Sequence, residues 1–147
     1  MKFAEFAPGR VIELGPVTLT DDQIVAFARD YDPQWFHADR ERASDGRWGG
    51  LIASGWQTCG VAMRLVVDHV LSGSESFGSP GLEYLKWPAP VRAGDALTLR
   101  AEVLDARRSA KTPALGILRW RWQLQNQRGE DVLDLVATSL FDVPPTA

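Results

Sequence analysis

The hydrophobic period of this chain changes once, and that change constrains the fold more than any other sequence feature. Residues 53–71 follow a helical pattern with almost no polar face, which is typical of a buried helix. Beyond residue 82 apolar and polar residues alternate, in segments around 82–87, 97–103, 118–125 and 133–141. Such alternation indicates strands with one face in water. We therefore predict an α+β fold: at least four strands with hairpin-like links form one antiparallel sheet wrapped around a long central helix.

The first third of the chain predicts one strand, one short helix and a long irregular segment. Residues 10–19 are rich in β-branched side chains and predict the strand. Thr20 and Gln23 have the spacing of a capping box, which predicts a helix from Thr20 to near Tyr31, before Pro33. Residues 32–50 have no regular period, and an irregular segment of this length is usually functional or disordered.

Composition disfavours several classes of protein. The chain has 147 residues, enough for a single domain over residues 1–147. Its 1 cysteine cannot form an intrachain disulfide, so a reducing compartment, the cytoplasm, is expected. A net charge of −3 does not attract nucleic acid, and no apolar run approaches the roughly 20 residues needed to cross a membrane. No cluster has metal-ligand spacing, and we expect neither a metal nor a cofactor.

The chain has 2 histidines, so few residues could perform acid–base chemistry. His37 lies in the irregular segment, five residues after Asp32 and seven after Asp30. An imidazole and a carboxylate at such a short separation can polarise one water between them. Either group can act as the base while the other acts as the acid. The alternative is a solvated pair in a loop. His69 lies in the apolar helix beside Asp68, and we expect it to make only local contacts.

Residues 49–56 form a glycine-rich entry to the apolar helix. The start of a helix carries unpaired N–H groups and the positive end of its dipole, which can bind the oxygen of a thioester or a phosphate. The alternative, compatible with the first, is that small residues let this helix pack closely against the sheet.

Three segments together resemble a known family. Residues 30–39 (DYDPQWFHAD), 49–56 (GGLIASGW) and 90–97 (PVRAGDAL) are similar to motifs of the MaoC-like dehydratases, which are hot-dog-fold (R)-specific enoyl-CoA hydratases. The resemblance covers about residues 8–142. It implies a central helix wrapped by an antiparallel sheet, an acyl-CoA substrate, and at least a homodimer. It also implies that an Asp and a His activate the water that adds across the C2=C3 bond of a trans-2-enoyl thioester.

The family motif, Asp-x-Asn-Pro-x-His, does not align without a choice. Asp32 stands where the family has Asn, and two extra residues precede His37. Alignment from the preceding helix makes Asp30 the catalytic acidic residue. The five-residue distance to His37 makes it Asp32, which we favour. The resemblance also assigns the oxyanion role to backbone N–H groups near Gly55.

The remaining candidate substrate-binding residues follow from the same resemblance. Ser54 stands where the family usually has a His before the helix glycine. Trp56 supplies a further N–H at the start of the helix. Trp35 and Phe36, like Trp48, are large aromatic residues in the irregular segment that argue against disorder, and they either line an acyl pocket or only pack.

Two other functions are compatible with the same residues. The first is a hot-dog acyl-CoA thioesterase, which needs a base placed to hydrolyse the thioester. The second is a non-catalytic acyl-CoA-binding domain whose motif has drifted, an idea that the two extra residues before His37 keep open. We expect hydration of an enoyl thioester, the function that the Asp/His segment fits best.

Overall fold

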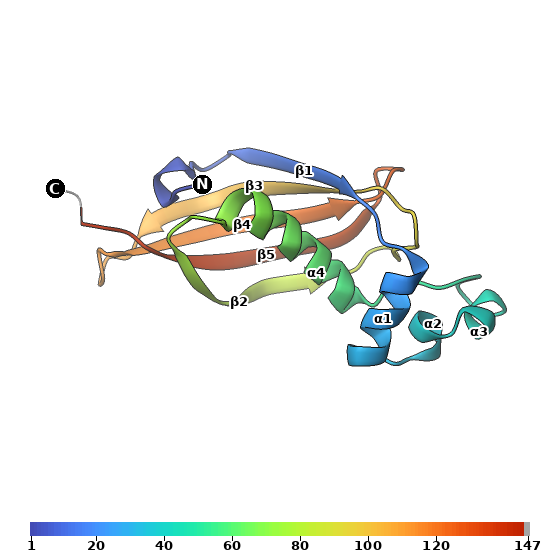
Figure 1. Ribbon diagram of the computed structural model, residues 1–147. Helices are drawn as coiled ribbons and strands as arrows, with labels where there is room; N and C mark the ends of the chain where they lie inside the picture. The colour runs from blue at the N-terminus through green and yellow to red at the C-terminus, as the bar shows by residue number, and fades with distance from the viewer. Residues whose placement is uncertain (146–147) are drawn as a thin grey trace.

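The computed structural model describes residues 1–145. The domain expected over residues 1–147 also includes Thr146 and Ala147, which lie outside the described residues. The elements follow in the order β1 (Val11–Val17), α1 (Asp21–Tyr31), α2 (Trp35–Ala38), α3 (Arg40–Ser44), α4 (Gly55–Val66), β2 (Ser76–Lys86), β3 (Leu97–Arg108), β4 (Leu115–Gln125) and β5 (Asp131–Asp142). Figure 1 shows α4 lying along one face of the sheet, with α1, α2 and α3 gathered near its N-terminal end.

All five strands form one sheet, and every neighbouring pair is antiparallel. The strand order is β1-β3-β4-β5-β2. Strands β3, β4 and β5 are joined by two hairpins, as the expected hairpin-like links predicted. The expectation of a hairpin-like link was wrong between β2 and β3, because β2 pairs with β5 at the far edge. The proline-containing segment 87–96 instead returns the chain to the other side of the sheet.

The alternation predicted from the sequence is confirmed by burial in β3, β4 and β5, whereas β2 is mostly exposed and shows no such alternation. Apolar residues of β3, β4 and β5 point toward the helix and form the core with α4, among them Leu97, Leu99, Leu118, Trp120, Leu124 and Leu133. On the outer face of β4, Arg119 pairs with Glu83 and Arg121 pairs with Asp134. The arginine–tryptophan alternation of β4 therefore separates a core face from a wet face.

The central helix is less buried than its sequence predicted. It begins at Gly55, ends as an α-helix at Val66, and continues as one turn of π-helix over Val67–Leu71. Ala62, Leu65 and Val66 are buried against the sheet, but Trp56 is 60% and Met63 43% exposed. The sheet of one chain covers only one side of α4, which leaves the opposite apolar face open. The sequence pattern alone does not distinguish these two situations.

The helix α1 forms as predicted. Thr20 Oγ1 accepts the N–H of Gln23 at 3.1 Å, and Gln23 Oε1 accepts the N–H of Thr20 at 2.9 Å, which completes the capping box. The expectation of an irregular segment over residues 32–50 was only partly right, because it contains α2 and α3. Helices of 4 and 5 residues are too short to show a period in the sequence.

Candidate active site

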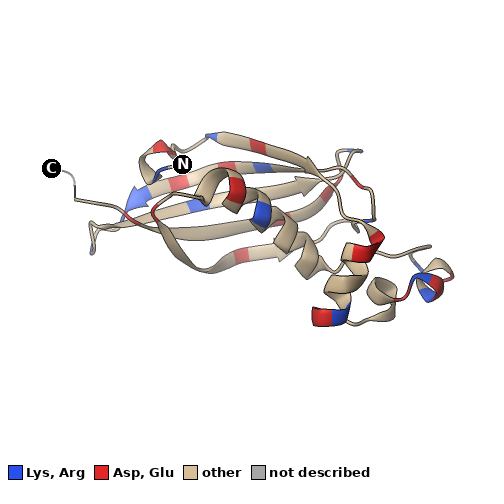
Figure 2. Ribbon diagram, viewed as in Figure 1, with Lys and Arg blue, Asp and Glu red and all other residues tan. Residues whose placement is uncertain are grey.

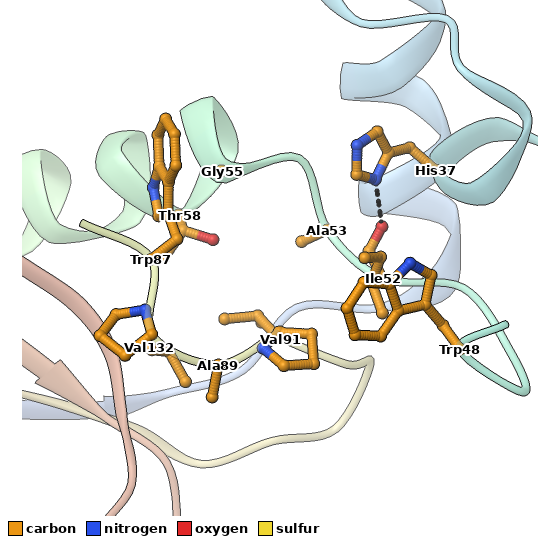
Figure 3. Close-up of a pocket in the computed structure, with 12 residues that line it drawn as sticks. His37, Trp48, Ile52, Ala53, Gly55, Thr58, Trp87, Ala89, Val91 and Val132 are labelled. Atoms are coloured by element: carbon orange, nitrogen blue, oxygen red, sulfur yellow. Dashed lines mark hydrogen bonds between the residues drawn. The ribbon is translucent and has the colours of Figure 1, made fainter. Parts of the chain in front are cut away.

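The imidazole of His37 is buried and fixed by the carbonyl that faces it. His37 lies on the short helix α2, and its side chain is 7% exposed. Nδ1 lies 2.7 Å from the carbonyl oxygen of Ile52, as Figure 3 shows. A carbonyl oxygen only accepts hydrogen bonds, so Nδ1 carries a proton and donates it. The ring of Phe36 packs against the imidazole with centroids 4.4 Å apart. Since Nδ1 is used by the Ile52 carbonyl, Nε2 is the nitrogen available for chemistry.

Asp32 holds its carboxylate against that second nitrogen. Its Oδ2 lies 3.2 Å from His37 Nε2 and accepts the Ser54 hydroxyl at 2.7 Å, while its Oδ1 accepts Gln34 Nε2 at 2.8 Å. Asp32 follows the last residue of α1, where Pro33 prevents the helix from continuing. Burial by itself would raise the pKa of the Asp32 carboxyl, but the hydrogen bonds from Gln34 and Ser54 and the nearby imidazole together lower that pKa.

The direct contact revises one detail of the sequence-based hypothesis. A water between Asp32 and His37 would need the two groups roughly twice as far apart as one hydrogen bond. At 3.2 Å they touch each other. A water activated by this pair therefore has to lie beside the two groups and not between them.

The structure brings Asp32, and not Asp30, to the imidazole. Asp30 is exposed in the last turn of α1. Residues of a helix are separated by about 100°, so a step of two residues turns Asp30 to the other side of the helix axis. Within residues 1–145, Asp32 is the one carboxylate in contact with the His37 imidazole. The spacing argument that favoured Asp32 agrees with this geometry.

The start of α4 forms the wall opposite His37. Ser54 is the N-cap, with its Oγ accepting the N–H of Trp56 at 3.3 Å. The N–H of Gly55, the first helical residue, has no acceptor among residues 1–145. Gly55 also packs closely, because a Cβ there would lie 2.4 Å from the indole ring of Trp87. Gly55 therefore combines both roles considered for the glycine-rich start of the helix: its N–H is a free hydrogen-bond donor, and its lack of a side chain allows close packing.

A cavity of about 290 Å³ lies between these two walls. Figure 3 shows His37, Ile52 and Trp48 on one side and Gly55, Thr58 and Trp87 on the other. The rest of its lining is apolar: Ala53, Pro88, Ala89, Pro90, Val91 and Val132. A mostly apolar cavity with a few polar groups at one end is typical of a site for a small organic group.

Of the residues predicted to bind substrate or to line an acyl pocket, Gly55 and Trp48 line this cavity and the others do not. The Ser54 side chain is fully buried and bonded to Asp32. Trp56 stacks edge-on against Trp87, with centroids 5.2 Å apart, and lines a second cavity of about 330 Å³ on the open face of α4. Phe36 packs on His37, as described above. Trp35 lies under the guanidinium of Arg42, 4.7 Å from its ring centroid.

Trp87 and Thr58 are among the residues of the cavity wall that the sequence did not predict. Trp87 follows β2 and precedes Pro88, at the point where the strand alternation breaks. An aromatic residue beside such a break was the available signal. Thr58 lies one turn into α4, buried, and donates a long 3.4 Å hydrogen bond to the Ser54 carbonyl; its position on the inner face of an apolar helix carried no signal.

The described residues offer neither a metal site nor a membrane-spanning helix. Over residues 1–145, no group of three or more His, Cys, Asp or Glu side chains could hold a metal ion. No helix in the same range is long and apolar enough to cross a membrane.

Comparison with known proteins gives the family. Residues 3–116 match the family described as MaoC like domain. The uncharacterized protein YdeM of Bacillus subtilis is 34% identical over 134 residues, which cover 91% of this chain and 94% of YdeM. The 3-hydroxyacyl-thioester dehydratase Z of Mycobacterium tuberculosis is 36% identical over 80 residues, and this match spans about half of each protein (53% and 53%).

A solved structure agrees over nearly the whole chain. The MaoC-like dehydratase from Rhodospirillum rubrum is 34% identical, superposes with a TM-score of 0.86, and the match covers 97% of both chains. The sheet wrapped around one helix is therefore the hot-dog fold, as the sequence resemblance implied. This chain belongs to the MaoC-like domain family, whose members include hydratases and dehydratases.

Proposed function

We propose that this protein is an (R)-specific enoyl-CoA hydratase, or 3-hydroxyacyl-CoA dehydratase in the reverse direction, that adds water to a trans-2-enoyl thioester. The observation that carries the proposal is the contact between Asp32 and the buried His37, 3.2 Å apart, because His37 lines an apolar cavity that Gly55, with its unpaired N–H, lines as well. The names of the relatives, a 3-hydroxyacyl-thioester dehydratase and a MaoC-like dehydratase, support the same reaction. The (R) configuration follows from the family resemblance.

The hydrogen bonds of Asp32 and His37 indicate which of the two side chains carries a proton. Both oxygens of Asp32 accept donors, from Ser54 and from Gln34, which favours the ionised carboxylate. Since Nδ1 of His37 already donates to Ile52, the contact of Nε2 with Asp32 is favourable only if Nε2 also carries a proton. In this arrangement Asp32 is the base and His37, through Nε2, the acid.

With these roles, Asp32 and His37 can add one water to the enoyl thioester and return to their starting state. The Asp32 carboxylate takes a proton from water while the water oxygen bonds to C3 of the enoyl group. Negative charge develops on the thioester oxygen, where the Gly55 N–H and the positive end of α4 stabilise it. His37 Nε2 then donates its proton to C2. The proton on Asp32 passes to Nε2 across their direct contact, which restores the pair and leaves a 3-hydroxyacyl thioester.

The test is to mix the purified protein with crotonyl-CoA and follow two signals. Hydration removes the absorbance of the conjugated double bond without releasing a thiol, which is the expected result. Release of a free thiol would identify the thioesterase instead. Binding of crotonyl-CoA with neither signal would identify the non-catalytic acyl-CoA-binding domain. Chiral analysis of the 3-hydroxyacyl product tests the (R) configuration, which an (S) product would contradict.

The exposed apolar face of α4 supports a homodimer or a higher homo-oligomer as the working form. Trp56, Met63 and Leu82 are exposed and line one groove between α4 and the edge strand β2. Arg64 is the one charged residue within α4, near its C-terminal end, and Figure 2 shows the rest of this helix without charge. A patch of this kind marks an interface, and a second copy of the chain is the partner we propose. Cytoplasmic location remains a prediction.

A further inference from the structure

Ser54 joins the two halves of the proposed site through one hydroxyl group. Its side chain is completely buried. The Oγ accepts the N–H of Trp56 from the first turn of α4 and donates to Oδ2 of Asp32, the same oxygen that faces His37. Its assignment as a substrate-binding residue came from its position before the helix glycine, but this side chain has no surface left for a substrate.

We infer that Ser54 is a positioning residue: its hydroxyl holds the Asp32 carboxylate ionised and turned toward His37, at a set distance from the Gly55 N–H of α4. The inference rests on the proposed function, since it assigns how the base of that reaction is held. Ser54 makes no contact with the cavity and is therefore not itself a catalytic residue.

The direction of the hydrogen bonds supports this role. A hydroxyl has one proton and can accept as well as donate. Because the Trp56 N–H uses Oγ as an acceptor, the hydroxyl proton is free to point at Asp32, and the 2.7 Å distance is that of a bond to a charged acceptor. The chain of bonds from Trp56 through Ser54, Asp32 and His37 ends at the Ile52 carbonyl. Within it, the Trp56 N–H polarises the Ser54 hydroxyl and so strengthens its bond to Asp32.

Removal of the hydroxyl has a predictable sign. Asp32 Oδ2 would lose its neutral donor and keep only the imidazole, which is the one titratable group that pairs with Asp32 among residues 1–145. Since the Ser54 hydrogen bond lowers the pKa of the Asp32 carboxyl, its loss raises that pKa. A base must be ionised to act, so the acidic limb of the kcat/KM profile moves to higher pH.

The experiment compares three variants of the full chain in crotonyl-CoA hydration over a range of pH. Ser54→Ala removes the hydroxyl, and Ser54→Thr keeps it. Thr20→Ala is the control for loss of a helix cap, because it removes the N-cap of α1 at the end of that helix opposite to Asp32. We expect Ser54→Ala to lower kcat on the order of tenfold, the effect of one hydrogen bond to a charged group, and to move the acidic limb upward. Ser54→Thr and Thr20→Ala should keep the wild-type pH profile.

Two results would overturn the inference. One is a folded Ser54→Ala variant with the wild-type acidic limb. The other is a Thr20→Ala variant whose limb moves as far as that of Ser54→Ala, since the effect would then come from the loss of any helix cap. An NMR titration of the Asp32 carboxyl carbon measures the pKa of that carboxyl directly and does not require the protein to be active. If the wild-type protein does not hydrate crotonyl-CoA, the proposed function fails, and an upward shift of the Asp32 pKa in Ser54→Ala still tests the Ser54 bond.

Discussion

At the scale of single residues, the candidate site depends on which atoms meet rather than on which residues are present. The sequence offers two aspartates near His37, and both are compatible with acid–base chemistry. Helix α1 separates them: it turns Asp30 toward solvent and ends so that Asp32 folds back onto the imidazole. The Ile52 carbonyl then decides which nitrogen of His37 faces the carboxylate.

The two aspartates give a matched pair of variants. We expect His37→Ala and Asp32→Asn each to lower kcat for crotonyl-CoA hydration by about a hundredfold or more, the range for loss of a general acid or base. Asp30→Asn, the same chemical change on an exposed residue two positions away, should keep nearly full activity. Light scattering and circular dichroism check that all three variants stay folded and keep the wild-type mass. A larger loss from Asp30→Asn than from Asp32→Asn would reverse our assignment of the base.

At the scale of the elements, the first turn of α4 and the segment after β2 are matched in shape. Trp87 occupies the space where any side chain at position 55 would begin. The indole ring in turn stacks against Trp56 of the same helix. Close approach of these two elements is what brings the Gly55 N–H to the wall of the cavity.

Substitution of this glycine tests that packing. In Gly55→Ala the new Cβ would lie 2.4 Å from the Trp87 ring, so the indole or the helix must move. We expect a loss of about 1–3 kcal/mol in the free energy of unfolding, as for overpacking elsewhere, together with a fall in kcat. Urea unfolding measures the first effect. A Gly55→Ala variant with the stability and the kcat of the wild-type protein would contradict this account of the packing.

The outer face of the sheet carries a pH-dependent contribution to stability. Arg121 donates two hydrogen bonds, of 3.0 and 2.9 Å, from β4 to Asp134 of β5, and the Tyr84 hydroxyl donates a third. The bonds from Arg121, against the opposing effect of burial, lower the pKa of the Asp134 carboxyl. A carboxyl with a lowered folded-state pKa stabilises the fold above its unfolded pKa, about 4, and loses that contribution as pH falls through the folded value.

Asp134→Asn isolates that contribution. We expect the variant to be roughly 1 kcal/mol less stable than the wild-type protein near neutral pH. The difference should shrink as the pH falls below about 4 and the wild-type carboxyl takes up its proton. Urea unfolding at several pH values measures both quantities. A difference that stays constant into acid would mean that shape, and not the charge of Asp134, stabilises the sheet.

At the scale of the whole molecule, the exposed apolar face of α4 favours an assembly of two or more chains over a single chain. One sheet covers one side of the helix, and Trp56, Met63 and Leu82 remain open on the other. Strand β2 is also an edge of the sheet, with unpaired backbone groups along one side. A second copy of the chain could cover both features at once.

We expect light scattering to give at least twice the mass of one chain. Leu82→Asp should shift the protein toward the mass of one chain, because it would bury an unpaired carboxylate in the interface. Val11→Asp is the matched control: Val11 is 40% exposed but lies on β1, at the opposite edge. It should leave the mass unchanged. A wild-type protein with the mass of one chain would contradict the dimer and leave the Asp32–His37 site unaffected.

The sequence by itself determined the elements whose signal is local. The capping box predicted the start of α1, Pro33 its end, and the alternation along β3, β4 and β5 predicted which face of each strand is buried. Period and capping depend on neighbours within a few residues, so they can be read without knowing the fold. The five-residue spacing of Asp32 and His37 belongs to the same class of signal.

Only the tertiary structure decided what depends on residues far apart in the chain. The carbonyl of Ile52 orients His37, the hydroxyl of Ser54 is 22 residues from Asp32, and Trp87 lies against Gly55. The short helices α2 and α3, the pairing of β2 with β5 and the open face of α4 are of the same kind. Each follows from which surfaces the packed chain brings together, and a local pattern of hydrophobicity carries no information about that partner.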